Sequence, residues 1–133
     1  MEPVEINAGA WYLRGLRADE RITDVPALSD LGIADPAAYV AATDAAWRDD
    51  TGFVWAVCEP TTGELLAVIG VLPTAGSASI AGRCRTGHRA VLGAAVGPVA
   101  RFARGALDLV VDDLASDDDP VADGVITDAI PTL

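Results

Sequence analysis

The sequence predicts one domain of the α/β class, because segments with strand composition alternate with segments of helical periodicity. The chain has 133 residues, a length that fits a single domain spanning residues 1–133. Apolar residues make up 51% of the chain, which is enough for a compact core and excludes a disordered chain. Two strand-like runs, Phe53–Cys58 and Glu64–Leu72, are joined by a short glycine-containing turn and predict a β-hairpin.

Three elements are expected before the hairpin. Trp11–Arg17 alternates apolar and polar residues, which predicts a first strand. Asp19–Leu31 carries apolar residues at helical spacing around a proline, which predicts a broken helical segment. Asp35 and Pro36 have the residue types of an N-cap and a first helical position, so they predict an alanine-rich helix over Ala37–Arg48.

The second half of the chain predicts one more long helix and several short strands. Ser77–Gly82 has the composition of a third strand beside the hairpin. Ala90–Leu107 places apolar residues at a 3.6-residue period and predicts a helix. Leu109–Val111 predicts a short buried strand, Asp112–Asp119 a polar, acid-rich segment, and Gly124–Ile130 a last strand.

Composition and charge argue against nucleic-acid and membrane partners. Twenty acidic residues against nine basic ones give a formal net charge of −11, whereas general nucleic-acid binding needs a basic surface. The apolar stretches are shorter than the roughly 18–20 residues that span a bilayer. The acidic N-terminal residues lack the basic flank and apolar run of a secretory signal, so we expect a cytoplasmic protein.

The basic residues, all of them arginine, are unevenly placed along the sequence. Five of the nine lie between residues 83 and 104, a window that contains no acidic residue: Arg83, Arg85, Arg89, Arg101 and Arg104. From Asp108 onward there are eight aspartates and no basic residue. The acid-free window is a reasonable place for a ligand that carries phosphate.

Cysteine and histidine are too few for several kinds of site. Cys58 and Cys84 are the only cysteines and lie far apart, so neither a disulfide framework nor a zinc site is expected. With His88 as the only histidine, a histidine-based triad or a metal centre is not expected either. We expect both cysteines to be small buried or half-buried apolar groups.

The segment Arg85-Thr86-Gly87-His88-Arg89-Ala90 joins a predicted strand to the predicted long helix. Amide groups at a helix start have no partner within the helix and lie at the positive end of its dipole. They bind phosphate well where a glycine lets the chain approach closely. The segment therefore predicts a phosphate-binding loop, while an ordinary surface turn is the alternative for so short a motif.

Several stretches, in this order, resemble the GNAT superfamily of acetyl-CoA-dependent N-acetyltransferases, in particular the branch that acetylates ribosomal-protein N-termini and related bacterial enzymes. The resemblance covers about residues 11–116 and rests on four stretches: Leu13-Arg14-Gly15-Leu16-Arg17-Ala18-Asp19-Glu20, the hairpin from Trp55-Ala56-Val57 to Thr62-Gly63-Glu64-Leu65, Arg85–Ala90, and Ala100–Leu109. It implies a mixed, mainly antiparallel central sheet flanked by helices, an α/β (α+β) fold that here is shortened at the C-terminus.

The resemblance also implies an activity and a cofactor site. Acetyl-CoA would donate its acetyl group to an amine, which is either a protein N-terminus or a small molecule. The fourth and fifth strands would separate and admit the pantetheine arm. The pyrophosphate would lie on the loop formed by Arg85, Thr86, Gly87, His88, Arg89 and Ala90.

Some positions depart from the pattern of the family. Arg89 stands where a second Gly or Ala is usual, and Cys84 where Arg or Gln is usual. Asp113-Leu114-Ala115-Ser116 resembles the family segment Asn-x-x-Ser, which makes Ser116 the candidate catalytic residue, with a helix N-cap as its alternative. Glu59 and Glu64 can be ordinary turn residues, so the sequence assigns no general base.

The sequence after Val111 is short for this family. Only 22 residues follow, where the family has a helix and two more strands. A missing strand leaves an unpaired sheet edge, which predicts that a second copy or another partner covers it. The alternative to an active acetyltransferase is therefore a degenerate GNAT-fold module that binds or assembles without catalysis.

Overall fold

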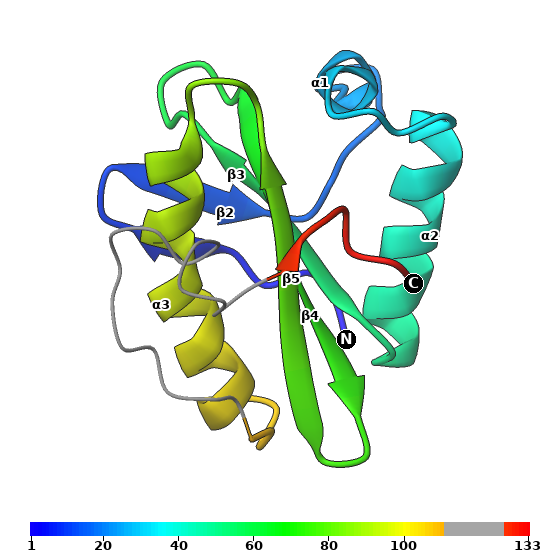
Figure 1. The fold of residues 1–133 in the computed structure, drawn as a ribbon. Coiled ribbons are helices and arrows are strands. Elements are labelled where there is room, and N and C mark those ends of the chain that lie inside the picture. The colour runs from blue at the N-terminus through cyan, green and yellow to red at the C-terminus, as the bar shows by residue number, and fades with distance from the viewer. Residues whose placement is uncertain (111–126) are drawn as a thin grey trace.

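A central sheet carries the structure, a computed structural model that describes residues 1–110 and 127–133 (Figure 1). In these residues the sheet has six strands in the order β1-β2-β3-β4-β5-β6. The strands are β1 Ile6–Ala8, β2 Trp11–Arg14, β3 Phe53–Cys58, β4 Leu65–Thr74, β5 Ser77–Cys84 and β6 Thr127–Asp128. The first five pair antiparallel with their neighbours, and β6 pairs parallel with β5. The predicted mixed, mainly antiparallel sheet is confirmed.

Helices cover both faces of the sheet. Helix α3 (Arg89–Gly105) packs on one face, and α1 (Val25–Asp30) and α2 (Pro36–Asp49) lie on the other side (Figure 1). Asp35 is the N-cap of α2, as predicted, and its side chain accepts a hydrogen bond of 3.2 Å from the amide of Ala38.

The predicted hairpin forms the centre of the sheet. Strand β3 pairs with β4 along its whole length, and all six of its residues are buried. Alternate side chains point to opposite faces. Phe53, Trp55 and Val57 pack in the cluster under α3, whereas Val54, Ala56 and Cys58 pack in the cluster under α1 and α2. Burial on both faces explains why these strands are nearly all apolar rather than alternating.

Three aromatic side chains anchor α2 and α3 to the hairpin. The rings of Trp47 and Trp55 lie 5.0 Å apart at 90°, and those of Trp55 and Phe102 lie 5.3 Å apart at 86°. Edge-to-face contacts of this kind add to the stability that burial provides. The indole nitrogen of Trp47 also donates to the carbonyl of Val54, so α2 is fixed to the strand by both packing and hydrogen bonding.

The N-terminal part differs from the prediction in three places. Strand β1 was not predicted, and β2 ends at Arg14 rather than Arg17. Helix α1 begins only at Val25, because the side chain of Asp19 accepts hydrogen bonds from the amides of Arg21 and Ile22 and holds a turn there. Such local bonds compete with helix formation.

The predicted strands after α3 are described only in part. Val110 makes a single parallel bridge to Ser77, and Val111 lies outside the described residues. Of the predicted strand Gly124–Ile130, residues 127 and 128 form β6. The acid-rich segment 112–119 lies outside the described residues. Among the described residues, no helix has the length and apolar character needed to cross a membrane.

Candidate functional site

The loop between β5 and α3 is the predicted phosphate-binding loop, and its backbone is well defined. The amide of Arg85 donates to the carbonyl of Leu66 and so extends the pairing of β4 with β5. The amide of His88 then donates to the carbonyl of Arg85, which closes a turn immediately before α3 begins at Arg89. Gly87 has a φ of +85° within this turn, a conformation that favours glycine. The chain needs glycine here to pass from strand to helix.

The start of α3 is suited to an anion. His88 is the N-cap, but its side chain caps no amide, and the first turn of the helix contains no acidic residue. The amides of the first turn therefore keep the partial positive charge of the helix end. Thr86, Gly87, Arg89 and Ala90 are exposed, and a Cβ built on Gly87 would meet nothing within 4 Å. There is open space beside these amides.

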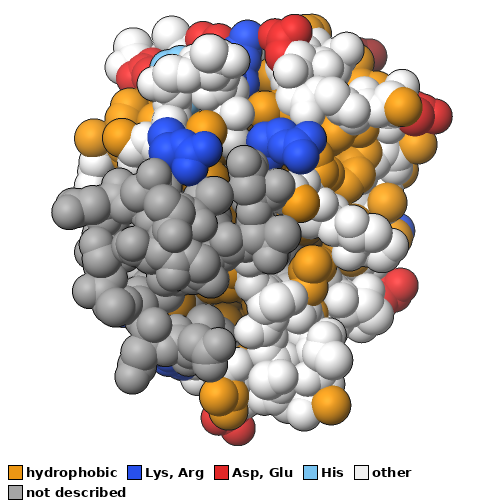
Figure 2. Space-filling view, in the orientation of Figure 1, with side chains coloured by type: hydrophobic (Ala, Val, Ile, Leu, Met, Phe, Trp, Pro, Cys, Tyr) orange, Lys and Arg blue, Asp and Glu red, His pale blue; other side chains and the backbone are white. Residues whose placement is uncertain are grey.

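The guanidinium of Arg85 is held by two carboxylates. Its nitrogens lie 2.7 Å from Asp30 at the end of α1 and 2.6 Å from Glu64, the residue before β4. Both carboxylates are more than half exposed, and the arginine side chain is 27% exposed. Figure 2 shows arginine and acidic side chains close together on the upper part of the molecule. Because exposed ion pairs are weak, Arg85 can exchange these partners for another anion.

Arg83 also contacts α1. Its guanidinium donates a 3.2 Å hydrogen bond to the carbonyl of Leu31, which follows the helix. Residues 83 and 85 lie two apart, so their side chains point to the same face of the sheet. The end of β5 thus fixes the end of α1 through two arginines.

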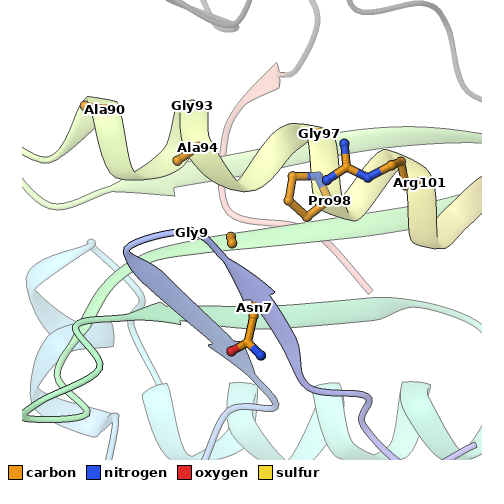
Figure 3. A pocket seen from close by; sticks show the side chains of 9 residues that line it. Asn7, Gly9, Ala90, Gly93, Ala94, Gly97, Pro98 and Arg101 are labelled. Carbon is orange, nitrogen blue, oxygen red and sulfur yellow. The ribbon is translucent and has the colours of Figure 1, made fainter.

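Two of the six predicted cofactor-binding residues line cavities, and the two cavities are different. Arg85 lines a cavity of about 380 Å³ between α1 and the β3–β4 turn, together with Asp30, Thr62 and Glu64. Ala90 lines another, of about 470 Å³, between the β1–β2 turn and the small residues of α3 (Figure 3). The loop therefore faces both sides of the sheet, which the sequence did not indicate.

A buried ion pair lies beside the cavity that Arg85 lines. Arg14 binds Asp24 through two hydrogen bonds of 2.9 and 2.8 Å, and both side chains are almost fully buried. Burial lowers the pKa of Arg14, but the hydrogen bonds that it donates to Asp24 and the charges of Cys58, Asp24 and Tyr12 together outweigh burial and leave the pKa raised. Asp24 also accepts from the amide of Arg17, and Arg14 donates to the carbonyl of Gly63. This network joins β2, the start of α1 and the β3–β4 turn.

The pairing of Asp24 with Arg14 and the pairing of Asp30 with Arg85 were not predicted. The partners lie 10 and 55 residues apart in the sequence. Only Asp24 has a local indication of a structural role, since it directly precedes the Val-Pro start of a helix. For Asp30 nothing in the local sequence indicates a partner just after β5.

None of the described carboxylates near the loop has the environment of a general base. Glu59 accepts from the amide of Thr62, and such backbone hydrogen bonds lower its pKa. Glu64 is occupied by Arg85. Ser116, the predicted catalytic residue, lies outside the described residues. The role of these two glutamates as turn residues agrees with the contacts that they make.

The outer edge of β5 is paired at two points. At its start Ser77 bridges to Val110, and the amide of Ala78 donates to the Val110 carbonyl. Further along, Ala81 and Gly82 pair with Thr127 and Asp128 of β6. The family resemblance implies that the fourth and fifth strands separate. In the predicted order these are Ser77–Gly82 and Leu109–Val111, so the separation would lie along this edge of β5. At Ala81 and Gly82 the edge is paired with β6 instead.

Comparison with known proteins supports the fold and nothing finer. No protein-family model matches the sequence, and neither does any curated protein. A solved structure from Vibrio cholerae, described as "a putative ribosomal-protein-serine acetyltransferase", is similar with a TM-score of 0.68 and 18% identity. The match covers 86% of this chain and 78% of that one. At this identity the likeness shows a shared fold, so the predicted GNAT-like fold is confirmed while the branch is not.

Proposed function

We propose that the protein is an acyltransferase that moves an acetyl group from acetyl-CoA to an amine, either a protein N-terminus or a small molecule. The observation that carries this is the exposed, uncapped start of α3 behind the Gly87 turn, in a fold shared with an acetyltransferase-like structure. The five arginines of the acid-free window agree with a phosphate-bearing ligand.

In the proposed reaction the amine attacks the thioester carbonyl directly. The new C–N bond forms, the C–S bond breaks, and coenzyme A leaves as the thiolate. The proton lost by the amine goes to a base or to an ordered water molecule. Positioning two reactants in this way can be worth roughly 7–11 kcal/mol in well-aligned systems. The protein would thus act mainly by holding the two substrates together.

The residues of the β5–α3 loop would hold the diphosphate of the cofactor. The amides of Gly87, Arg89 and Ala90 supply the hydrogen-bond donors, and the hydroxyl of Thr86 lies beside them in the sequence. Arg85 and Arg89 would add charge. Because these groups are at the surface, we expect acetyl-CoA affinity to fall as salt rises, with screening over about 8–10 Å.

The test is calorimetric titration of the protein with acetyl-CoA, using two glycine variants. Gly87→Ala places a Cβ at a residue whose φ is +85°, at the point where the diphosphate is proposed to approach the backbone. We therefore expect acetyl-CoA affinity to fall at least about tenfold. Gly76→Ala is the matched control, because Gly76 has a φ of +87° and equally open surroundings at the far β4–β5 turn. Absence of acetyl-CoA binding by the wild type would refute the proposal.

A second candidate function is a GNAT-fold module that binds or assembles without catalysis. It is favoured by the contacts of Arg85, which holds α1, and by the pairing of β6 along β5. Turnover with a panel of peptide and small amines decides between the two. Binding of acetyl-CoA without turnover would favour the module, in which case light scattering at micromolar concentrations should show a dimer.

A further inference from the structure

The segment Thr127–Leu133 runs from the edge of β5 across the sheet to α2 (Figure 1). Thr127 and Asp128 pair with Ala81 and Gly82, and the amide of Ala129 donates a 3.1 Å hydrogen bond to the carbonyl of Gly82. Gly82 is only three residues before Arg85, where the proposed diphosphate loop begins. The segment is therefore anchored directly beside the proposed cofactor site.

The surface under this segment is shaped to receive it. Pro131 is buried against Gly70 of β4, where an added Cβ would lie 2.8 Å from the Cβ of Pro131. The hydroxyl of Tyr39 on α2 donates a 2.7 Å hydrogen bond to the carbonyl of Pro131. Ile130 packs on the cluster under α1 and α2. Strand β4 and helix α2 thus contribute to a seat for Ile130 and Pro131.

We propose that residues 127–133 are an autoinhibitory strap. This inference rests on the proposed function and on the family resemblance, which implies that the pantetheine arm of acetyl-CoA enters along the outer edge of β5. The strap occupies that edge at Ala81 and Gly82. Cofactor and strap therefore compete for the same backbone groups. Acetyl-CoA binds when the strap leaves β5.

The strength of the competition follows from the number of contacts that hold the strap. When binding requires a minor open state, the apparent dissociation constant equals the intrinsic one divided by the open fraction. Weakening the strap by one hydrogen bond should raise a small open fraction, and with it the apparent affinity, about three- to tenfold. Variants that loosen the strap should bind acetyl-CoA more tightly than the wild type.

Two variants release the strap from opposite sides. Ala129→Pro removes the amide that bonds Gly82 and leaves the seat unchanged, and Ala129→Gly, which keeps the amide, is its control. Gly70→Ala places a Cβ 2.8 Å from the Cβ of Pro131 and 3.1 Å from Cγ2 of Val54, so it closes the seat without altering the strap itself. Gly105→Ala, whose Cβ would meet nothing within 4 Å, is its control. The NMR chemical shifts of the Ile130 methyl groups, which pack on the cluster under α1 and α2, report whether the strap is released, independently of any ligand.

We expect Ala129→Pro and Gly70→Ala to move the Ile130 methyl shifts toward those of an unpacked side chain and to lower the acetyl-CoA dissociation constant about three- to tenfold, with both controls unchanged. A peptide with the sequence of residues 127–133, added to Ala129→Pro, should weaken acetyl-CoA binding again, whereas a scrambled peptide should not. Release of Ile130 without tighter binding would overturn the strap and leave the proposed function standing. If the wild type does not bind acetyl-CoA, the proposed function itself fails and the strap with it.

Discussion

Arg14 and Arg85 lie at the same end of the sheet, and each binds carboxylates, yet their surroundings differ. The side chain of Arg14 is 6% exposed and that of its partner Asp24 is 2% exposed. The side chain of Arg85 is 27% exposed, and its partners Asp30 and Glu64 are 60% and 56% exposed. The distances are nearly equal, between 2.6 and 2.9 Å. Burial, and not contact geometry, separates the two pairs.

This difference decides what each arginine can do. Breaking a buried pair leaves one charge without water or a partner, so Arg14 and Asp24 are committed to holding β2, α1 and the β3–β4 turn together. An exposed pair loses little when water or another anion replaces a partner, so Arg85 can exchange Asp30 and Glu64 for a ligand. The three predictions below test the contrast.

The largest loss of stability is expected for Asp24→Ala. The substitution leaves the guanidinium of Arg14 buried without its carboxylate, so we expect the free energy of unfolding to fall by about 3–5 kcal/mol. Urea unfolding followed by tryptophan fluorescence measures this. Asp44→Ala is the control, because its pair with Arg48 is exposed and 3.7 Å long, and it should cost about 0.5 kcal/mol or less. Similar losses for the two variants would remove the contrast.

Cys58, which lies beside the buried pair, is expected to make the free energy of unfolding depend on pH, with an effect of intermediate size. Burial raises the pKa of its thiol from 9.0 to about 11, with a smaller opposing effect of Arg14. The neutral thiol is therefore favoured in the folded state. Its contribution to stability is complete below pH 9 and is lost as pH rises through about 11, on the order of 2 kcal/mol in all.

The measurement is urea unfolding of the wild type and Cys58→Ala between pH 8 and pH 11.5. Tyr12, whose pKa burial and Glu5 raise to about 12, titrates in both proteins, and Cys58→Ala removes only the smallest cause of its shift, the charge of Cys58. The stability of Cys58→Ala should fall less steeply above pH 9 than that of the wild type. Parallel curves for wild type and Cys58→Ala would show that this thiol does not titrate differently on folding.

The smallest effect on stability is expected for Arg85→Ala. Loss of two exposed ion pairs should lower the free energy of unfolding by only about 0–1 kcal/mol. Under the proposed function the same variant should weaken acetyl-CoA binding and reduce its dependence on salt. Asp30→Asn, which frees Arg85 from one partner, should leave stability nearly unchanged and strengthen binding. A loss of several kcal/mol for Arg85→Ala would make this residue structural, like Arg14.

Much of the fold could be predicted because its signals are local. The Asp35-Pro36 start of α2, the apolar strands β3 and β4 with their glycine-containing turn, and the periodicity of α3 all lie within short windows. Strand β1 has only three residues, and the start of α1 depends on the hydrogen bonds of Asp19. A strand this short carries too little periodicity to be recognised, so β1 was not predicted. The start of α1 was predicted too early, because the turn at Asp19 gives no periodic pattern.

The candidate site was only partly predictable for the same reason. The Gly87 turn, the helix that follows it and the concentration of arginines around them can be predicted from the sequence, because these features depend on neighbouring residues. The burial of Arg14 with Asp24, the contacts of Arg85 with Asp30 and Glu64 at the surface, and the pairing of residues 127–129 with β5 are set by the folded chain. These contacts join segments that are distant in the sequence, and burial, which sets the strength of each, exists only once the chain has folded.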